Sequence, residues 1–302
     1  MGRKRRKAPG SLSTGRPQTL RTRSASLSRK AARLLISRHH ALAKRKTAAA
    51  KRGDDEEAAV ISAEIDALGG LPRYQQASLL GQSKDRGGDS SKVLLEWLRP
   101  FLRMKMHQRS PDTAVARLAR PVKMLEVGAL SSTNACSASP YFDVERIDLH
   151  SQEPGILRQD FMKRPLPDGE AQKFDIISLS LVLNFVPDAA GRGNMLRRTL
   201  RFLVESTESA EAEQNGETTP FPSVFVVLPR SCIANSRYLT EERFDELMTS
   251  LGFRKFSSRV TEKLAYSLWK RDASAQTEKA QFLKKQVNPG RSRNNFAIIL
   301  QT

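Results

Sequence analysis

The chain has 302 residues, with 51 Lys and Arg against 32 Asp and Glu, and a formal net charge of +19 at pH 7. This length allows one large domain or two small ones, and no apolar run approaches the roughly 18 residues of a membrane span. Two cysteines, and four histidines without metal-ligand spacing, exclude a disulfide framework and predict a reduced protein that binds no metal.

The positive charge is concentrated at the N-terminus. Residues 1–52 contain 17 Lys and Arg and no acid, whereas residues 53–302 contain 34 basic and 32 acidic residues. We therefore predict a disordered basic arm at 1–52, whose cluster from Arg3 to Lys7 is typical of nuclear localisation or nucleic-acid contact. A solubilising tail and a mitochondrial presequence are the alternatives. The absence of acids disfavours the first, and the mixing of Lys with Arg disfavours the second.

Residues 53–120 are predicted to form a helical extension that packs on the core. A helix is expected at 54–68, where apolar side chains recur at helical spacing before a pair of glycines. A polar loop at 84–91 then leads to the cap of another helix. This loop either folds over a ligand or serves only as a capped connector.

The rest of the chain is organised around the stretch from Pro121 to Asn134. It predicts a buried strand at 122–127 that breaks at Gly128 and enters a Ser/Thr/Asn cluster able to cap a following helix. A glycine at this turn lets a ligand approach the backbone closely, and the N–H groups of a helix start attract a negative group.

A second strand at 142–149 strengthens the prediction of a ligand site. Asp148, near its carboxyl end, has the usual spacing for a carboxylate that binds ribose hydroxyls in a βαβ nucleotide fold. Glu126 at the end of the first strand disfavours a dinucleotide, because the pyrophosphate would lie over an acidic turn. S-adenosylmethionine fits better, since its sulfonium and ammonium groups are cationic and it carries no phosphate.

The remaining elements alternate in type. Further strands are expected at 174–182, 223–229, 264–270 and 295–300, and helices at 192–204 and after a Thr240 cap. Residues 205–219 are predicted to be a flexible insertion, and the segment 284–293 is basic.

Two sets of residues resemble known enzymes. Glu126 followed by Gly128 resembles the first motif of class I S-adenosylmethionine-dependent methyltransferases, although Leu130 and Ser132 replace the later glycines. A longer resemblance is to the fungal nucleolar enzymes that methylate N1 of an adenine in large-subunit (25S) ribosomal RNA. It is carried by Gly69 to Ser78, Lys84 to Ser91 and Leu125 to Asp188.

The resemblance implies an α/β fold for residues 121–302. The expected architecture is Rossmann-like, with a seven-stranded, mostly parallel sheet and an antiparallel last strand, and the strands at 264–270 and 295–300 are expected to close it as an antiparallel pair. Gly128 and Asp148 match the family's cofactor-binding positions. Glu126, at the end of the first strand, is a further expected cofactor-binding residue. Asp160 is another, because it lies at the end of the third strand, where the family's proteins contact the adenine of the cofactor.

The residues after the fourth strand supply the candidate catalytic pair. Asn184-Phe185-Val186-Pro187 loosely resembles the Asn-Pro-Pro-aromatic signature of amino-group methyltransferases, which implies that Asn184 bonds the target base and Phe185 stacks on it. A strand end turned by Pro187 is the alternative reading. Adenine N1 attacks with a lone pair, so alignment and a dry pocket matter more than a strong base. The target must be single-stranded or flipped, because N1 lies on the pairing edge.

We therefore predict an S-adenosylmethionine-dependent methyltransferase of the nucleus and nucleolus. Its expected partner is ribosomal RNA, as such or in a pre-60S particle during ribosome biogenesis, and neither a membrane nor a metal is expected. The alternative is a sensor that binds the same cofactor to control a protein partner, but the basic arm favours the RNA enzyme. A dehydrogenase is disfavoured because the glycine-rich dinucleotide fingerprint is missing.

Overall fold

The structure is a computed structural model that describes residues 28–81, 88–107, 120–151, 153–205, 219–272 and 281–301. The basic cluster from Arg3 to Lys7, the first half of the loop at 84–91 and nearly all of the predicted insertion at 205–219 lie outside these ranges.

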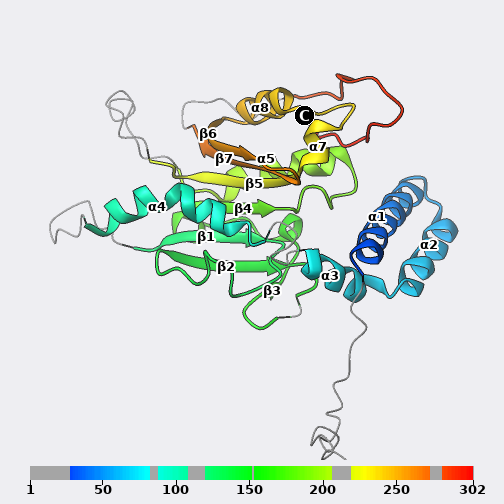
Figure 1. The fold of residues 1–302 in the computed structure, drawn as a ribbon, viewed down its shortest axis with the longest axis horizontal. Coiled ribbons are helices and arrows are strands. Elements are labelled where there is room, and N and C mark those ends of the chain that lie inside the picture. The colour runs from blue at the N-terminus through cyan, green and yellow to red at the C-terminus, as the bar shows by residue number, and fades with distance from the viewer. Residues whose placement is uncertain are drawn as a thin grey trace, which may run out of the picture.

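A seven-stranded sheet forms the centre of the molecule. Its strands are β1 (Val122–Val127), β2 (Phe142–Asp148), β3 (Leu157–Arg158), β4 (Ile176–Ser180), β5 (Ser223–Pro229), β6 (Phe253–Val260) and β7 (Leu264–Arg271). They lie in the order β3-β2-β1-β4-β5-β7-β6, with β3 to β5 in parallel and β7 antiparallel to both of its neighbours (Figure 1). The predicted class I methyltransferase fold is thus confirmed.

Helices cover both faces of this sheet, and three others lie beyond the carboxyl ends of its parallel strands (Figure 1). They are α1 (Arg29–Lys51), α2 (Asp55–Ala67), α3 (Gly70–Gly81), α4 (Ser91–His107), α5 (Ala189–Phe202), α7 (Arg230–Ala234) and α8 (Glu241–Ser250), with short 3-10 helices η4 (Phe161–Lys163) and η5 (Glu170–Gln172). Because side chains alternate along a strand, Met124 packs on the α4 face and Leu125 on the opposite face, which α5, α7 and α8 cover. The predicted helices at 54–68, 192–204 and after Thr240 are confirmed as α2, α5 and α8.

The antiparallel edge of the sheet differs from the prediction. β6, and not the predicted strand at 295–300, pairs with β7. The C-terminal residues instead lie directly on α5, where a Cβ added to Gly193 would come within 1.8 Å of the Ile299 carbonyl oxygen. Ile298 and Leu300 are buried in the core on that side, so this segment buries its apolar side chains against a helix and not in a strand pair.

The N-terminal region also corrects the prediction of a disordered arm over residues 1–52. Residues 29–51 form α1, whose first turn is capped by the Ser28 hydroxyl. Leu42 and Ala49 are buried against Ile61 of α2, and Arg38 forms an ion pair with Glu64. The prediction of disorder was therefore wrong for residues 29–51. It rested on the charge of the arm alone, whereas α2 supplies both an apolar surface and the acids that α1 lacks.

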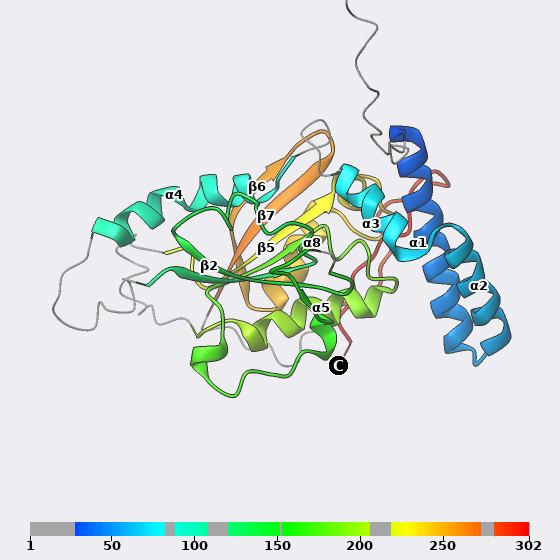
Figure 2. The ribbon, with the colours of Figure 1, turned by 90° about the horizontal axis from the view of Figure 1, so that it is seen from below.

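The helices α1, α2 and α3 form a helical module beyond the carboxyl ends of the parallel strands (Figures 1 and 2). The predicted extension at 53–120 is consequently divided, since α2 and α3 belong to this module whereas α4 lies on the sheet. None of the described helices is both long and apolar enough to cross a membrane.

Candidate functional site

The predicted cofactor residues gather at one edge of the sheet. In the strand register, Glu126 of β1 lies between Arg146 of β2 and Ser178 of β4. The strand order reverses direction between β1 and β4, and ligands of open α/β sheets bind outside the carboxyl ends of the strands at such a switch point. The switch point between β1 and β4 is therefore the place where a ligand of this sheet is expected to bind, and it coincides with the site that the sequence predicts.

Gly128 forms the turn after β1. Its φ angle is +73°, and its backbone N–H donates to the Ile147 carbonyl oxygen at 2.8 Å. A Cβ at this position would lie 2.7 Å from Cγ2 of Val182, in the segment that follows β4. The site thus requires a residue without a side chain, both for the left-handed backbone and for the close approach of two segments.

The helix predicted after this turn does not form, and residues 128–141 make a series of turns instead. Side chains of the protein itself accept several N–H groups of this segment. The bonds include those from Ala135 N to Asp89 Oδ2 at 2.6 Å, from Cys136 N to Ser91 Oγ at 3.2 Å, and from Ser137 N to Asn134 Oδ1 at 2.9 Å. The predicted helix start is therefore absent, and the N–H group of Ala135 is already bound by the carboxylate of Asp89.

Glu126 is held beneath this turn segment. Asn134 donates its Nδ2 hydrogens to both carboxylate oxygens, at 3.0 and 2.8 Å. Burial raises the pKa of Glu126 to about 7, and the hydrogen bonds from Asn134 and the charge of Arg146 oppose that rise. The carboxyl group is thus poised to ionise near neutral pH, and a cation beside it would favour the ionised form.

The two other predicted acids lie at the ends of the neighbouring strands. Asp148 is the last residue of β2, and its Oδ1 accepts from the His150 backbone N–H at 2.8 Å. Asp160 follows β3, and its Oδ1 caps η4 by accepting from Met162 N at 2.8 Å. Both acids therefore have one oxygen that fixes a local turn.

The described part of the predicted polar loop lies at the same edge. Asp89 Oδ1 accepts from Ser91 N at 2.9 Å at the start of α4, as expected for a cap. In addition, the Ser90 hydroxyl bonds to the Ser180 hydroxyl at the end of β4, at 2.8 Å. Residues 88–91 thus cap α4 and also form one wall of the site.

The candidate catalytic pair follows β4. Leu181 has a φ angle of +57°, which turns the chain sharply after the strand. Phe185 is 37% exposed, whereas the Asn184 Oδ1 atom is buried and has no hydrogen-bond partner among the residues that the structure describes. The segment therefore presents an accessible ring beside an unused acceptor.

Arg192 holds this segment in place, a role that sequence reasoning missed. The Arg192 side chain is only 3% exposed and lies 4.4 Å from the centre of the Phe296 ring. Burial lowers its pKa below the ordinary value. It donates to the carbonyl oxygens of Leu183 at 3.1 Å, Val186 at 3.0 Å, Pro187 at 3.4 Å and Ala297 at 2.6 Å. One guanidinium thus joins the segment after β4 to the C-terminal residues.

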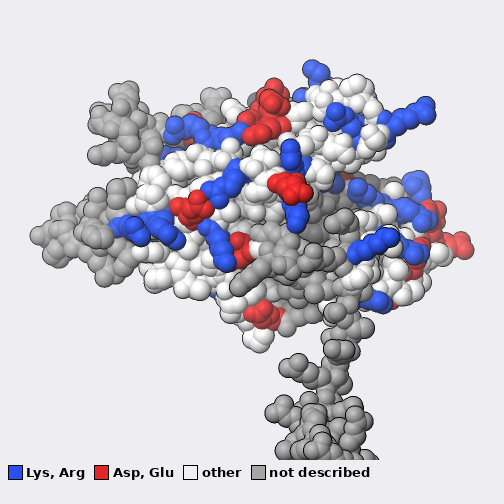
Figure 3. Space-filling model, viewed as in Figure 1, with Lys and Arg blue, Asp and Glu red and all other residues white. Residues whose placement is uncertain are grey.

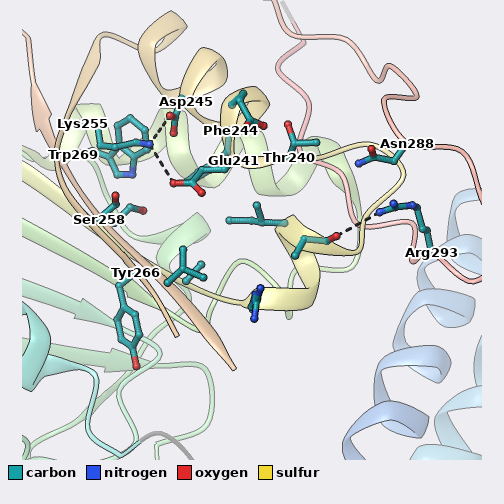
Figure 4. A pocket seen from close by; sticks show the side chains of 17 residues that line it. Thr240, Glu241, Phe244, Asp245, Lys255, Ser258, Tyr266, Trp269, Asn288 and Arg293 are labelled. Atoms are coloured by element: carbon teal, nitrogen blue, oxygen red, sulfur yellow. Dashed lines mark hydrogen bonds and ion pairs between the residues drawn. The ribbon is translucent and has the colours of Figure 1, made fainter. Parts of the chain in front are cut away.

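A separate pocket of about 340 Å³ lies between α7, α8 and the β6–β7 hairpin (Figure 4). Its wall includes Lys255, which forms ion pairs with Glu241 and Asp245, and Phe244 packs edge to face on Trp269 beside them. None of the predicted site residues lines this pocket. The described residues also contain no group of three or more His, Cys, Asp or Glu that could hold a metal ion.

Comparisons with known proteins identify the family. The family model described as "25S rRNA (adenine(2142)-N(1))-methyltransferase, Bmt2" matches residues 59–298. A Saccharomyces cerevisiae protein of that same description is 40% identical over 242 residues, which are 80% of this chain and 63% of the relative. A Schizosaccharomyces pombe 25S rRNA adenine-N(1) methyltransferase is 38% identical over 239 residues, 79% of each protein.

The chain therefore spans less than two thirds of the S. cerevisiae relative. A solved structure of the N-methyltransferase NodS from Bradyrhizobium japonicum WM9, in complex with S-adenosyl-l-homocysteine, is 10% identical with a TM-score of 0.35. That similarity covers 58% of this chain and 87% of the solved one. On the match to its model and to both yeast proteins, the chain belongs to the Bmt2 family of 25S rRNA (adenine(2142)-N(1))-methyltransferases.

Proposed function

We propose that the protein is an S-adenosylmethionine-dependent methyltransferase that modifies N1 of an adenine in large-subunit (25S) ribosomal RNA during ribosome biogenesis. The observation that carries the proposal is the position of Glu126, Gly128 and Asp148 at the carboxyl ends of β1 and β2, where Gly128 closely approaches Val182 in the segment that leads to Asn184 and Phe185. Family membership supports the same reaction, since both yeast relatives are named for it.

The residues at this edge suit the proposed cofactor. Bound S-adenosylmethionine supplies the methyl group on an electrophilic sulfonium. Gly128 would let it approach the backbone, Asp148 would accept hydrogen bonds from its ribose hydroxyls, and Glu126 would face its positive charge. Asp160 would lie toward its adenine. The buried and unused Oδ1 of Asn184 is the polar group left over for the second substrate.

The protein's own contribution to the reaction is alignment. Phe185 would hold the target base by stacking, and Asn184 would fix its orientation by a hydrogen bond. N1 of adenine has a lone pair and no proton at neutral pH, so no side chain must remove a proton before it reacts. The segment around Leu183 and Val186, fastened by Arg192, would exclude water from the reacting atoms.

The direct test is methylation of the RNA. The full chain is incubated with S-adenosylmethionine and 25S ribosomal RNA taken from cells that lack the family's enzyme, and 1-methyladenosine is mapped by primer-extension arrest. A new arrest at one adenine is expected. Cofactor binding without any arrest, on naked RNA and on purified pre-60S particles alike, would instead support the cofactor-sensing alternative.

Asp148→Ala is expected to weaken binding of S-adenosylhomocysteine by at least about 1.5 kcal/mol, or roughly tenfold, because a charged acceptor for the ribose is lost. Isothermal titration calorimetry measures the change. Asp143 is the matched control, since it is an exposed acid on the same strand. An Asp143→Ala variant that binds more weakly than Asp148→Ala would show that the wrong acid has been assigned to the ribose.

Affinity for S-adenosylmethionine should depend on pH through Glu126. Its carboxyl group has a raised pKa of about 7, and a cationic ligand prefers the ionised form. Affinity is therefore expected to rise by roughly eightfold between pH 6 and pH 7.5, if only the ionised form binds, and then to level off. The stability of the protein without ligand should change in the opposite direction. Because the folded-state pKa of Glu126 is raised from 4.5 to about 7, the free energy of unfolding falls as the pH rises between these two values.

Glu126→Gln tests this assignment. The variant should bind S-adenosylmethionine more weakly and with an affinity that is flat over the same pH range, because glutamine does not titrate. An unchanged pH slope in the variant would mean that another group causes the dependence.

We further propose a nuclear and nucleolar location and a pre-60S particle as the working substrate. The support is the basic composition of residues 1–27, together with the family's reaction. The deletion that tests targeting should end at residue 27, because α1 begins at Arg29. A fluorescent fusion that lacks 1–27 and still concentrates in nucleoli would show that this segment is not the targeting signal.

A further inference from the structure

A row of aromatic rings joins the helical module to the candidate site. The His39 ring of α1 stacks on Tyr74 of α3, with the ring centroids 4.5 Å apart and the planes at 29°. Tyr74 meets Phe185 edge to face, with centroids 5.6 Å apart and planes at 90°. Tyr74 therefore links α1 to Phe185, the ring that is proposed to stack on the target base.

The backbone on both sides directs these rings toward each other. Gly69 precedes α3 and Gly70 is its first residue; their φ angles are +93° and +60°, and a Cβ on Gly69 would lie 2.6 Å from the Arg73 side chain. Only glycine adopts this turn without strain, so α3 leaves α2 in a direction set by the two glycines. On the opposite side, the left-handed Leu181 turns the chain before Phe185. Such strain persists where the surrounding structure enforces it, often around ligands.

Packing alone does not explain the Tyr74–Phe185 pair. In the core, the edge-to-face pair of Phe244 and Trp269 is 2% and 1% exposed, as expected when ring contact serves stability. Phe185 is 37% exposed and Tyr74 is half-buried. Accessible aromatic rings at a crevice are surfaces on which unpaired nucleobases stack.

A polar atom with matching chemistry lies next to these rings in the chain. The buried Oδ1 of Asn184 is an acceptor without a partner among the described residues. The pairing edge of adenine carries an N6 amino donor beside N1. An acceptor that holds the amino group would leave N1 free to react, whereas a donor at this place would compete for N1.

Cationic side chains are numerous on the helical module. Figure 3 shows Lys and Arg side chains over this module and along α4. On α1, the exposed cations are Lys30, Arg38, Lys44, Arg45 and Lys46. Acids of α2 offset some of them, as Glu64 does for Arg38. RNA that delivers a base to Phe185 would find cations for its phosphates on the same module.

We propose that Tyr74 is a base-stacking residue, and that it completes with Phe185 the binding site for the flipped target adenine, whose N6 amino group is accepted by Asn184 Oδ1. His39 supports the Tyr74 ring from behind. The helical module is then one wall of the RNA site, and the glycine pair at the start of α3 serves to position Tyr74. This inference rests on the proposed function and names the part of the enzyme that recognises its substrate.

The test compares Tyr74→Ala with Tyr74→Phe in the full chain. Phe101→Ala is the matched control. Phe101 lies on α4, away from the site, and forms an edge-to-face pair with Phe256 of β6, with the ring centroids 5.5 Å apart. Methyl transfer is measured against RNA concentration at saturating S-adenosylmethionine, at a temperature where circular dichroism shows every variant to be folded. Tyr74→Ala should lower kcat/KM for RNA at least tenfold. Tyr74→Phe should recover most of it, and Phe101→Ala should match the wild type.

Two further readouts separate stacking from a scaffolding role. Affinity for S-adenosylhomocysteine should stay within twofold in Tyr74→Ala. An RNA oligonucleotide with 2-aminopurine at the methylated position keeps the stacking surface of adenine but lacks its N6 amino group, so it reports stacking alone. Its fluorescence should fall on binding the wild type, and fall less on binding Tyr74→Ala. Wild-type methylation by Tyr74→Ala, or a parallel loss of cofactor affinity, would overturn the inference. A wild-type chain that methylates no ribosomal RNA would overturn the proposed function and this inference together.

Discussion

Gly128→Arg is expected to abolish measurable binding of S-adenosylhomocysteine. The backbone at Gly128 is left-handed, which costs an L residue about 1–2 kcal/mol. The first atom of any side chain would also lie 2.7 Å from Val182 Cγ2, so a long cationic side chain must enter the crevice or displace the segment after β4. It would place a positive charge where a cationic ligand is proposed to bind. Calorimetry of the purified variant measures the loss.

The matched control for this substitution is Gly53→Arg. Gly53 has nearly the same φ angle, +71°, but a Cβ there would meet nothing within 4 Å. This control therefore carries the backbone strain without the steric block, and its affinity should equal that of the wild type. A folded Gly128→Arg protein that binds the ligand normally would place the cofactor pocket elsewhere.

Arg192→Met is expected to lower the free energy of unfolding by about 3 kcal/mol or more. Methionine fills much of the same space but leaves several buried carbonyl oxygens without a donor, and each such group costs about 1–3 kcal/mol. The segment from Leu183 to Pro187 would lose its fastening to the C-terminal residues. Methyl transfer should therefore fall more than cofactor affinity does, because the proposed cofactor residues lie at the ends of β1, β2 and β3.

Chemical denaturation measures the first effect, and initial rates at a temperature that keeps the variant folded measure the second. Arg201→Met is the control, since Arg201 is exposed on the same helix. Arg192→Lys should be intermediate, because an ammonium has three donors and cannot reproduce the planar fork of guanidinium. Equal losses of kcat and of cofactor affinity in Arg192→Met would show a purely structural role.

Local patterns in the sequence determined the elements of the core. β5 is an apolar run bounded by turn residues, β1 and β2 have apolar side chains interspersed with charged ones, and α8 follows a Thr240 cap with Glu241 and Glu242 in its first turn. The positions of Glu126, Gly128 and Asp148 at the ends of parallel strands were predictable for the same reason. Strand ends of a parallel sheet meet at one edge, so spacing along the chain translates directly into proximity.

Contacts between distant segments were decided only by the tertiary structure. A sequence pattern does not show that Asp89 and Asn134 would take the N–H groups of the turn after β1, and so replace the expected helix start. Nor does it show whether the C-terminal apolar residues pair with β7 or pack on α5, since the two choices bury similar side chains.

The basic arm also shows what could be predicted from the sequence and what depended on the tertiary structure. Composition correctly located the excess charge in residues 1–52, but the order of residues 29–51 depends on Ile61 and Glu64 of α2, which a charge count over the arm does not include. Likewise the motif around Tyr74 was visible in the sequence, whereas its contact with Phe185 arises from two left-handed turns. Strand spacing and helix caps depend on neighbouring residues and can be predicted from the sequence. Contacts between distant segments depend on how the whole fold packs, and no local sequence pattern predicts them.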